Sequence, residues 1–199
     1  GFSLSQNQFD ALVVLTYDIG TSWLSGNGVL KSAVKNGLTG NAFLNAIGQT
    51  SGYNSGTTWS VTAEQRRMIE ANMYLNGAYS NIAPSNYTYV DYVLEQGTMA
   101  EGANGRYRQY FDKNLNAVPA PVPTLKNMIF LGWYQIENGK ETWVPHLSTF
   151  QNERTLYARW QTPGIAYTDP TVKSVYNWQG KSLLATTAIY NNPVEQTIV

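Results

Sequence analysis

Carboxylate side chains are the groups in this chain that could carry out hydrolytic chemistry. Cleavage of a glycosidic bond needs one carboxylic acid to protonate the leaving oxygen, and a second carboxylate or a positioned water across the bond. Asp10 and Asp18 fall in one expected helix, where eight residues span about 12 Å along the axis. That distance is too long for a retaining pair and longer than an inverting pair usually needs. We therefore expect Asp10 to be a solvated or capping residue, and we do not expect the two carboxylates to act as a catalytic pair.

Two glutamates and the single histidine have structural explanations. Glu64 lies in the first turn of an expected helix, where the helix dipole favours a negative charge. Glu70 follows Arg66 by four residues and Arg67 by three, a spacing that predicts an exposed ion pair. His146 is the only histidine, so a catalytic triad or a metal site around it would lack its usual partners. We expect no catalytic residue, no metal and no cofactor in this chain.

Aromatic side chains are the better candidates for a binding site. Tyr and Trp rings stack on the apolar faces of pyranose sugars, and their polar atoms can hydrogen-bond hydroxyl groups. Trp23 follows Gly20 in an expected loop close to Tyr17, and we expect it to contact carbohydrate. Trp133 and Trp160, in contrast, are expected in the core of a small sheet.

The first 80 or so residues contain sequence signals for the starts and ends of helices. Ser5 with Gln8 and Thr62 with Gln65 form capping-box patterns, which predict helix starts. Glycines that follow the apolar periodicity predict helix ends, because glycine accepts the left-handed conformation after a last turn. The expected helices run from Ser5 to Gly20, from Val29 to Asn36, from Thr39 to Ile47 and from Thr62 to Leu75, the last three ended by Gly37, Gly48 and Gly77.

After Asn81 the pattern changes to residues that favour strands. Runs rich in Tyr, Thr, Val and Trp fit a pleated surface. The Asn138-Gly139 pair predicts a hairpin turn, and the prolines of segment 117–123 exclude it from a sheet interior. The expected strands are residues 86–94, 107–111, 129–134, 142–144 and 155–160, with possible further strands at 172–178 and 185–190. The sequence therefore predicts an α+β protein.

The composition excludes several classes of protein. The chain has 199 residues, of which 43% are hydrophobic and 13% charged, and this argues against disorder. The formal net charge is +0 with scattered basic residues, so we expect no nucleic-acid partner. Cysteine is absent, which excludes disulfides and thiolate metal sites, and no apolar run reaches membrane-spanning length. We expect an extracellular or cell-wall-associated bacterial protein, and we interpret the chain as a piece of a longer one.

The helical part resembles the C-terminal lobe of the phage-type lysozymes, glycoside hydrolase family 24, over roughly residues 3–79. The resemblance is carried by Gln8-Phe9-Asp10-Ala11-Leu12-Val13, by Tyr17-Asp18-Ile19-Gly20-Thr21 and by Arg66-Arg67-Met68-Ile69-Glu70-Ala71. In that family the catalytic glutamate precedes the matched region, so the resemblance implies that this chain lacks it. The resemblance also implies that Tyr17, Asp18 and Thr21, with Trp23 nearby, would line the sugar-binding groove.

Residues 87–160 resemble the Listeria–Bacteroides repeat, the β-grasp-like module seen as the B repeat of internalins. The matching residues are Phe130-Leu131-Gly132-Trp133-Tyr134 and Thr155-Leu156-Tyr157-Ala158-Arg159-Trp160, with Pro121 and Pro123 before them. The Gly-Tyr pair usual before the first segment is Asn127-Met128 here. This resemblance implies a spacer or adhesive module rather than an enzyme.

Together these observations predict a lysozyme-like helical domain over 1–82, a β-grasp-like repeat over 83–161, and an extended tail or partial third module over 162–199. We expect a non-catalytic module of a bacterial cell-surface or secreted protein that binds cell-wall glycan, adheres to a host surface or serves as a spacer. One alternative is the cleft-completing portion of a peptidoglycan-cleaving muramidase, whose catalytic lobe lies upstream. A purely architectural role is a third possibility. Other domains of the parent protein are the remaining expected partners.

Overall fold

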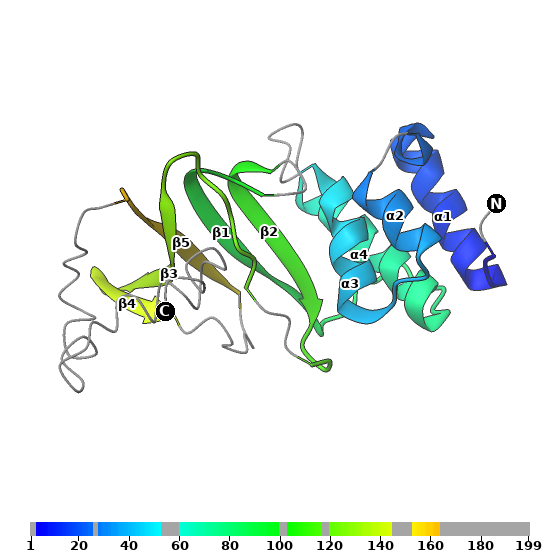
Figure 1. The fold of residues 1–199 in the computed structure, drawn as a ribbon. Coiled ribbons are helices and arrows are strands. Elements are labelled where there is room, and N and C mark those ends of the chain that lie inside the picture. The colour runs from blue at the N-terminus through cyan, green and yellow to red at the C-terminus, as the bar shows by residue number, and fades with distance from the viewer. Residues whose placement is uncertain are drawn as a thin grey trace. The chain divides into compact units, whose positions relative to one another are not determined.

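A computed structural model describes residues 3–25, 28–52, 60–99, 103–116, 120–144 and 153–163 (Figure 1). Within these residues the chain has four α-helices and a five-stranded sheet, which confirms the α+β prediction. The chain divides into two compact units. The helical unit contains the described residues up to Val90 together with 108–116 and Glu153, and the sheet unit contains 91–107, 120–144 and 154–163.

The helical unit has its helices at the four predicted places, with two short 3₁₀ turns between them. Their bounds are α1 (Gln6–Ile19), η1 (Ser22–Leu24), α2 (Val29–Lys35), α3 (Gly40–Gly48), η2 (Gln49–Ser51) and α4 (Val61–Asn76). Helix α1 packs on α4, α4 on α3, and α3 on α2 (Figure 1). The core between them is apolar; its fully buried members include Ala11, Leu15, Phe43, Leu44, Ile47 and Ala71.

Both ends of α1 follow the prediction. The backbone N–H of Ser5 donates to Oε1 of Gln8 over 3.0 Å, as a capping box requires. At the other end, Gly20 has φ +77°, and its N–H donates to the carbonyl of Thr16 over 2.9 Å. A positive φ of this kind is adopted by glycine at little cost.

The cap of helix α4 is Ser60, two residues before the capping residue Thr62 that the sequence predicted, so that prediction is wrong. Ser60 has an extended backbone and its hydroxyl accepts a hydrogen bond from the N–H of Ala63 over 3.0 Å. Ser60 therefore satisfies one of the first N–H groups of the helix, and Thr62 already lies inside it. The predicted stop at Gly77 is confirmed, since this residue is left-handed with φ +66°.

Helix α3 ends at Gly48, as predicted, but Gly48 does not have the left-handed conformation expected of it, since its φ is −59°. The helix includes it, η2 continues to Ser51, and the left-handed residue that follows is Gly52 with φ +85°. A Cβ atom at Gly48 would lie only 2.2 Å from Cδ2 of Tyr110, which is 1% exposed. Glycine is needed here for the close approach of a ring, not for its backbone freedom.

The sheet has strands β1 (Tyr87–Thr98), β2 (Asn104–Asp112), β3 (Ile129–Glu137), β4 (Lys140–Val144) and β5 (Arg154–Gln161), in the order β2-β1-β5-β3-β4 (Figure 1). All five predicted strands are confirmed, and most are longer than predicted. Strands β3 and β4 form the predicted antiparallel hairpin, with positive φ at both Asn138 and Gly139. Strand β5 pairs antiparallel with β3, and the register shifts between Phe130 and Gly132.

Trp133 lies in the core of the sheet unit, as predicted, with 1% of its surface exposed. Its indole N–H donates to the carbonyl of Pro121 over 3.0 Å. Trp160 is partly buried; its indole N–H donates to the carbonyl of Leu94 over 3.2 Å, and its ring packs against Phe130. The proline-containing segment thus supplies a carbonyl to the core tryptophan.

Several predictions lie outside the described residues, namely His146 and the possible strands at 172–178 and 185–190. Within the parts of the chain that the structure describes, no helix has both the length and the apolar character needed to cross a membrane.

Candidate functional site

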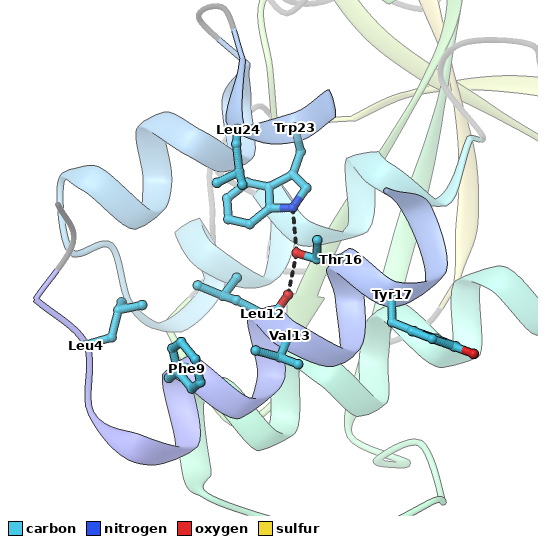
Figure 2. Close-up of a pocket in the computed structure, with 8 residues that line it drawn as sticks. All are labelled: Leu4, Phe9, Leu12, Val13, Thr16, Tyr17, Trp23 and Leu24. Atoms are coloured by element: carbon cyan, nitrogen blue, oxygen red, sulfur yellow. Dashed lines mark hydrogen bonds between the residues drawn. The ribbon is translucent and has the colours of Figure 1, made fainter. Parts of the chain in front are cut away.

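An apolar groove runs along α1 in the helical unit and has a volume of about 390 Å³ (Figure 2). Its walls come from α1, from the residue stretch before it and from η1. The lining residues are Leu4, Phe9, Leu12, Val13, Thr16, Tyr17, Trp23 and Leu24. The groove therefore brings together two of the four residues predicted to bind sugar, Tyr17 and Trp23.

The helical repeat explains why one face of α1 is left uncovered. Phe9, Val13 and Tyr17 follow one another every four residues, so they share a face of the helix. Their exposed fractions are 54%, 50% and 95%, whereas Ala11 and Leu15 on the inner face are fully buried. Figure 2 shows the Tyr17 ring pointing outward at one end of the groove. Helix α1 is thus apolar on two faces, of which only one is used in the core.

Trp23 is held in place by a short chain of hydrogen bonds. Its indole N–H donates to Oγ1 of Thr16 over 2.9 Å, and the Thr16 hydroxyl donates to the carbonyl of Leu12 over 2.6 Å (Figure 2). These bonds fix the indole against α1 and engage the polar atoms of both side chains. The surface that remains for a ligand is consequently almost wholly apolar, with the Tyr17 hydroxyl at its end.

Asp18 does not line the groove, although it follows Tyr17 directly. Its carboxylate accepts hydrogen bonds from Arg66 and Arg67 on α4, the latter over 2.6 Å. The hydrogen bond from Arg67 is the main cause that lowers the pKa of Asp18, opposed by partial burial and reinforced by the positive charges of Arg67 and Arg66. The geometry thus gives Asp18 the role of joining α1 to α4.

Thr21 also lies outside the groove. It precedes η1, and its carbonyl accepts a hydrogen bond from the N–H of Leu24 over 3.0 Å, while its side chain is exposed. The structure therefore separates the four predicted residues into a groove pair, Tyr17 and Trp23, and two residues with structural contacts, Asp18 and Thr21.

The ion pair of Glu70 is buried, so the prediction of an exposed pair is wrong. Glu70 pairs with Arg67, with 2.7 Å between Nε and Oε2, and their side chains are 2% and 1% exposed. Burial raises the pKa of Glu70, and the hydrogen bond and charge of Arg67 act in the opposite direction. Arg66, whose side chain is 56% exposed, pairs with Asp18 instead. Helix α4 turns the face with Arg67 and Glu70 inward, which the three-residue spacing alone could not reveal.

The other carboxylates of interest on the helices also have partners. Asp10 accepts hydrogen bonds from the Gln6 amide over 2.7 Å and from the Tyr79 hydroxyl over 2.6 Å. Glu64 pairs with Arg108 over 2.6 Å. No carboxylate is among the residues that line the α1 groove, and in the described part of the chain no three acidic or histidine side chains gather to hold a metal ion.

Six groove residues were missed from the sequence as candidates for a site: Leu4, Phe9, Leu12, Val13, Thr16 and Leu24. Phe9 and Val13 had counted only as part of the apolar periodicity of a helix. The available signal was the width of the apolar pattern in α1, since Phe9, Leu12, Val13, Val14 and Tyr17 cover more of the helix than one buried stripe requires.

Comparison with known proteins adds no further constraint. The chain matches no family model, no curated protein and no solved structure.

Proposed function

We propose that this chain is a non-catalytic module of a bacterial cell-surface or secreted protein and that it contacts cell-wall glycan through the α1 groove. The observation that carries the proposal is the pair of aromatic side chains in that groove, Tyr17 with 95% of its surface exposed and Trp23 fixed by Thr16. Such rings stack on the apolar faces of pyranose sugars.

The surroundings of the groove favour binding over bond cleavage. Hydrolysis of a glycoside requires a carboxylic acid beside the leaving oxygen. Two acidic residues adjoin groove residues in sequence: Asp18 is engaged by two arginines, and Asp10 accepts hydrogen bonds from Gln6 and Tyr79. The groove itself has no carboxylate among its lining residues. A ligand in this groove would be held but not cut by the residues around it.

The finer fold assignments belong to the same proposal. We propose that the helical unit is lysozyme-like and the sheet unit β-grasp-like. The order of helices α1 to α4 around one apolar core supports the first, and the strand order β2-β1-β5-β3-β4 supports the second. Both assignments fit secreted or wall-attached bacterial proteins rather than a nucleic-acid-binding protein.

The test is a pull-down of the chain on insoluble bacterial cell walls. Tyr17→Ala should reduce retention by about tenfold, the change expected for loss of about 1.4 kcal/mol of binding free energy. Tyr79→Ala is the matched control, because Tyr79 is also exposed, at 63%, but does not line the groove. Trp23→Ala should act in the same direction as Tyr17→Ala. Unchanged retention of the Tyr17 variant would contradict the proposal.

A second candidate function is the cleft-completing portion of a muramidase with its catalytic lobe upstream. One observation favours it: Phe9 and Val13 leave half of their surface exposed beside an almost wholly apolar groove, and such patches often mark contacts with other polypeptide. Wall suspensions should then clear with the parent protein but not with this chain alone. Clearing by this chain alone would contradict both candidates, and no clearing by the parent would remove the second.

A further inference from the structure

The helical unit has a second pocket, of about 310 Å³, beside the first turn of α4. Residues from α4, from the segment before β1 and from the helical-unit ends of β1 and β2 line it, together with the exposed Glu153. Those that matter for recognition are Glu64, Gln65, Ala83, Thr88, Tyr89 and Arg108. Its volume lies at the lower end of the range usual for small-molecule sites, which is roughly 300–1,000 Å³.

One wall of this pocket is polar and rigid. Arg108 and Glu64 form an ion pair over 2.6 Å, and their side chains are only 6% and 13% exposed. The guanidinium of Arg108 also lies over the ring of Tyr89, 3.6 Å from its centroid. These contacts hold donor and acceptor atoms in fixed positions, which lowers the entropy that a ligand must lose when it binds.

Another part of the lining, the tyrosine wall, is apolar and partly aromatic. Tyr87, Tyr110 and Met68 line the pocket together with Ala83 and Pro84. A pocket with one apolar wall and a few fixed polar groups is the usual form of a small-molecule site. The α1 groove differs from it, because that groove has almost no polar lining.

The paired charges decide which class of ligand suits the pocket. A phosphate would compete with Glu64 for Arg108 and would have to replace a buried pair. An ammonium group would either compete with Arg108 for Glu64 or pair with Glu153, which also lines the pocket but is exposed; an exposed pair contributes little free energy. A neutral ligand with several hydroxyl groups can hydrogen-bond both members of the pair while it leaves them together, since an ionised carboxylate accepts several hydrogen bonds and a guanidinium donates several. Its apolar face would meet the tyrosine wall.

We propose that this pocket binds one neutral pyranose unit, between the Glu64–Arg108 pair and the tyrosine wall. The inference rests on the proposed function for its ligand class, a cell-wall glycan, but places a saccharide unit at a site separate from the α1 groove. Two such sites on one module would allow a single glycan or two strands to be held at both, and would raise the retention on an insoluble wall above that of either site.

The test uses the full 199-residue chain and the neutral trisaccharide of β1,4-linked N-acetylglucosamine, with binding followed by NMR titration and calorimetry. Ala83→Trp fills the pocket, and Ile82→Trp is its matched control, because Ile82 is 74% exposed and does not line the pocket. The trisaccharide should bind the Ala83 variant at least about tenfold more weakly than the Ile82 variant, equivalent to about 1.4 kcal/mol. Backbone amides of Gln65 and Thr88 should shift on titration of the Ile82 variant but not of the Ala83 variant, whereas any shift at Phe9 and Val13, which line the α1 groove, should be the same in both.

A variant that keeps the apolar packing guards against loss of folding. Thr88→Val removes a hydroxyl from the lining with little change of shape, and it should weaken trisaccharide binding if the fold, followed by circular dichroism, is intact. Absence of trisaccharide binding, equal binding by the two tryptophan variants, or preferential binding of inorganic phosphate or of a lysine-rich peptide would overturn the inference.

The proposal for the α1 groove and the inference for the second pocket can be refuted independently. If Tyr17→Ala leaves wall retention unchanged while Ala83→Trp abolishes trisaccharide binding, the groove proposal is wrong and the pocket inference stands. If Tyr17→Ala reduces wall retention but the trisaccharide does not respond to Ala83→Trp, the opposite holds.

Discussion

Arg67 and Glu70 face each other inside the helical unit, with Nε–Oε2 and Nη2–Oε1 distances of 2.7 and 2.9 Å. Arg67 also donates to Asp18, so its guanidinium joins a neighbour on its own helix to the end of α1. The planar fork of arginine suits this double contact, which a lysine could not reproduce. The three residues form an ionic link that is buried at Arg67 and Glu70 and open to solvent at Asp18.

Removal of one member of this link should be costly. We expect Arg67→Met to lower the free energy of unfolding by about 3–5 kcal/mol, because it leaves Glu70 buried without its cation. The neighbouring Arg66→Met is the matched control; Arg66 is 56% exposed, and an exposed pair contributes about 0–1 kcal/mol. Urea denaturation of the two variants measures the difference. Equal losses of unfolding free energy in the two variants would show that the burial of Arg67 does not increase the cost of its removal.

Asp18 should make stability depend on acid. Its pKa is lowered in the folded chain from an ordinary value of 3.8, mainly by the hydrogen bond from Arg67. The stability it contributes is therefore fully present above about pH 3.8 and is lost as the pH falls through the lower folded-state value. We expect the stability difference between the wild type and Asp18→Asn to be larger at pH 7 than at pH 3.

The contribution of Glu70 to stability changes with pH in the opposite direction from that of Asp18, so the stability of the wild type alone does not report on Asp18. Burial raises the pKa of Glu70 above its ordinary 4.5, so its contribution is fully present below pH 4.5 and is lost as the pH rises through the folded-state value. Thermal unfolding of both proteins across pH 3 to 7 separates the two groups. A wild-type minus Asp18→Asn difference that does not change with pH would contradict the assignment.

Gly48→Ala gives a test in which packing and helix propensity predict opposite signs. Propensity alone predicts a gain of about 1 kcal/mol in the middle of a helix. The structure predicts a loss of about 1–3 kcal/mol, the usual cost of overpacking, because the new Cβ would lie 2.2 Å from the buried Tyr110 ring. Chemical denaturation decides between them.

The control for Gly48 is a double-mutant cycle with Tyr110→Leu. If the clash with the ring is the cause, Gly48→Ala should be much less harmful in the Tyr110→Leu background, so the two changes should not be additive. Additive effects would place the cause elsewhere in the helix.

Asn7 holds the end of α4 from a neighbouring helix. Its side-chain amide donates to the carbonyls of Met73 and Tyr74 over 3.0 and 2.9 Å, in the last turn of α4, where helix carbonyls lack intrahelical partners or are met by the cap residue. The carbonyl of Met73 also accepts a hydrogen bond from the N–H of Gly77 over 2.9 Å. Asn7→Ala should cost about 1–2 kcal/mol. Asn7→Asp should cost more, because it keeps the size but sets a carboxylate against two carbonyl oxygens at the negative end of the helix dipole. A stability ranking by urea denaturation with Asp above Ala would contradict this role.

Local pattern was enough to predict the elements but not their contacts. Capping at Ser5 and the left-handed Gly77 could be read from the chain, because both act on residues within one turn. The role of Gly48 could not, since the ring that needs its space, Tyr110, lies 62 residues further on. The contact exists only after the helix and the strand have come together.

The candidate site shows the same division. Tyr17 and Trp23 are close in sequence, and both line one groove on either side of the turn at Gly20. Asp18 is directed to the other side by Arg66 and Arg67, 48 and 49 residues away. The exposure of Phe9 and Val13 could not be predicted from the sequence either, because apolar periodicity does not say how many faces of a helix are covered by other elements.

Strands β1 and β2 each give residues to both compact units: Tyr87–Val90 and Arg108–Asp112 belong with the helices. Removal of everything after residue 82 would take Tyr110 away from Gly48 and leave Glu64 without its buried arginine. The helices alone are thus not an independent folding unit. Any natural or engineered shuffling of the helices must therefore include strands β1 and β2. Expression trials should place the C-terminal boundary after β2.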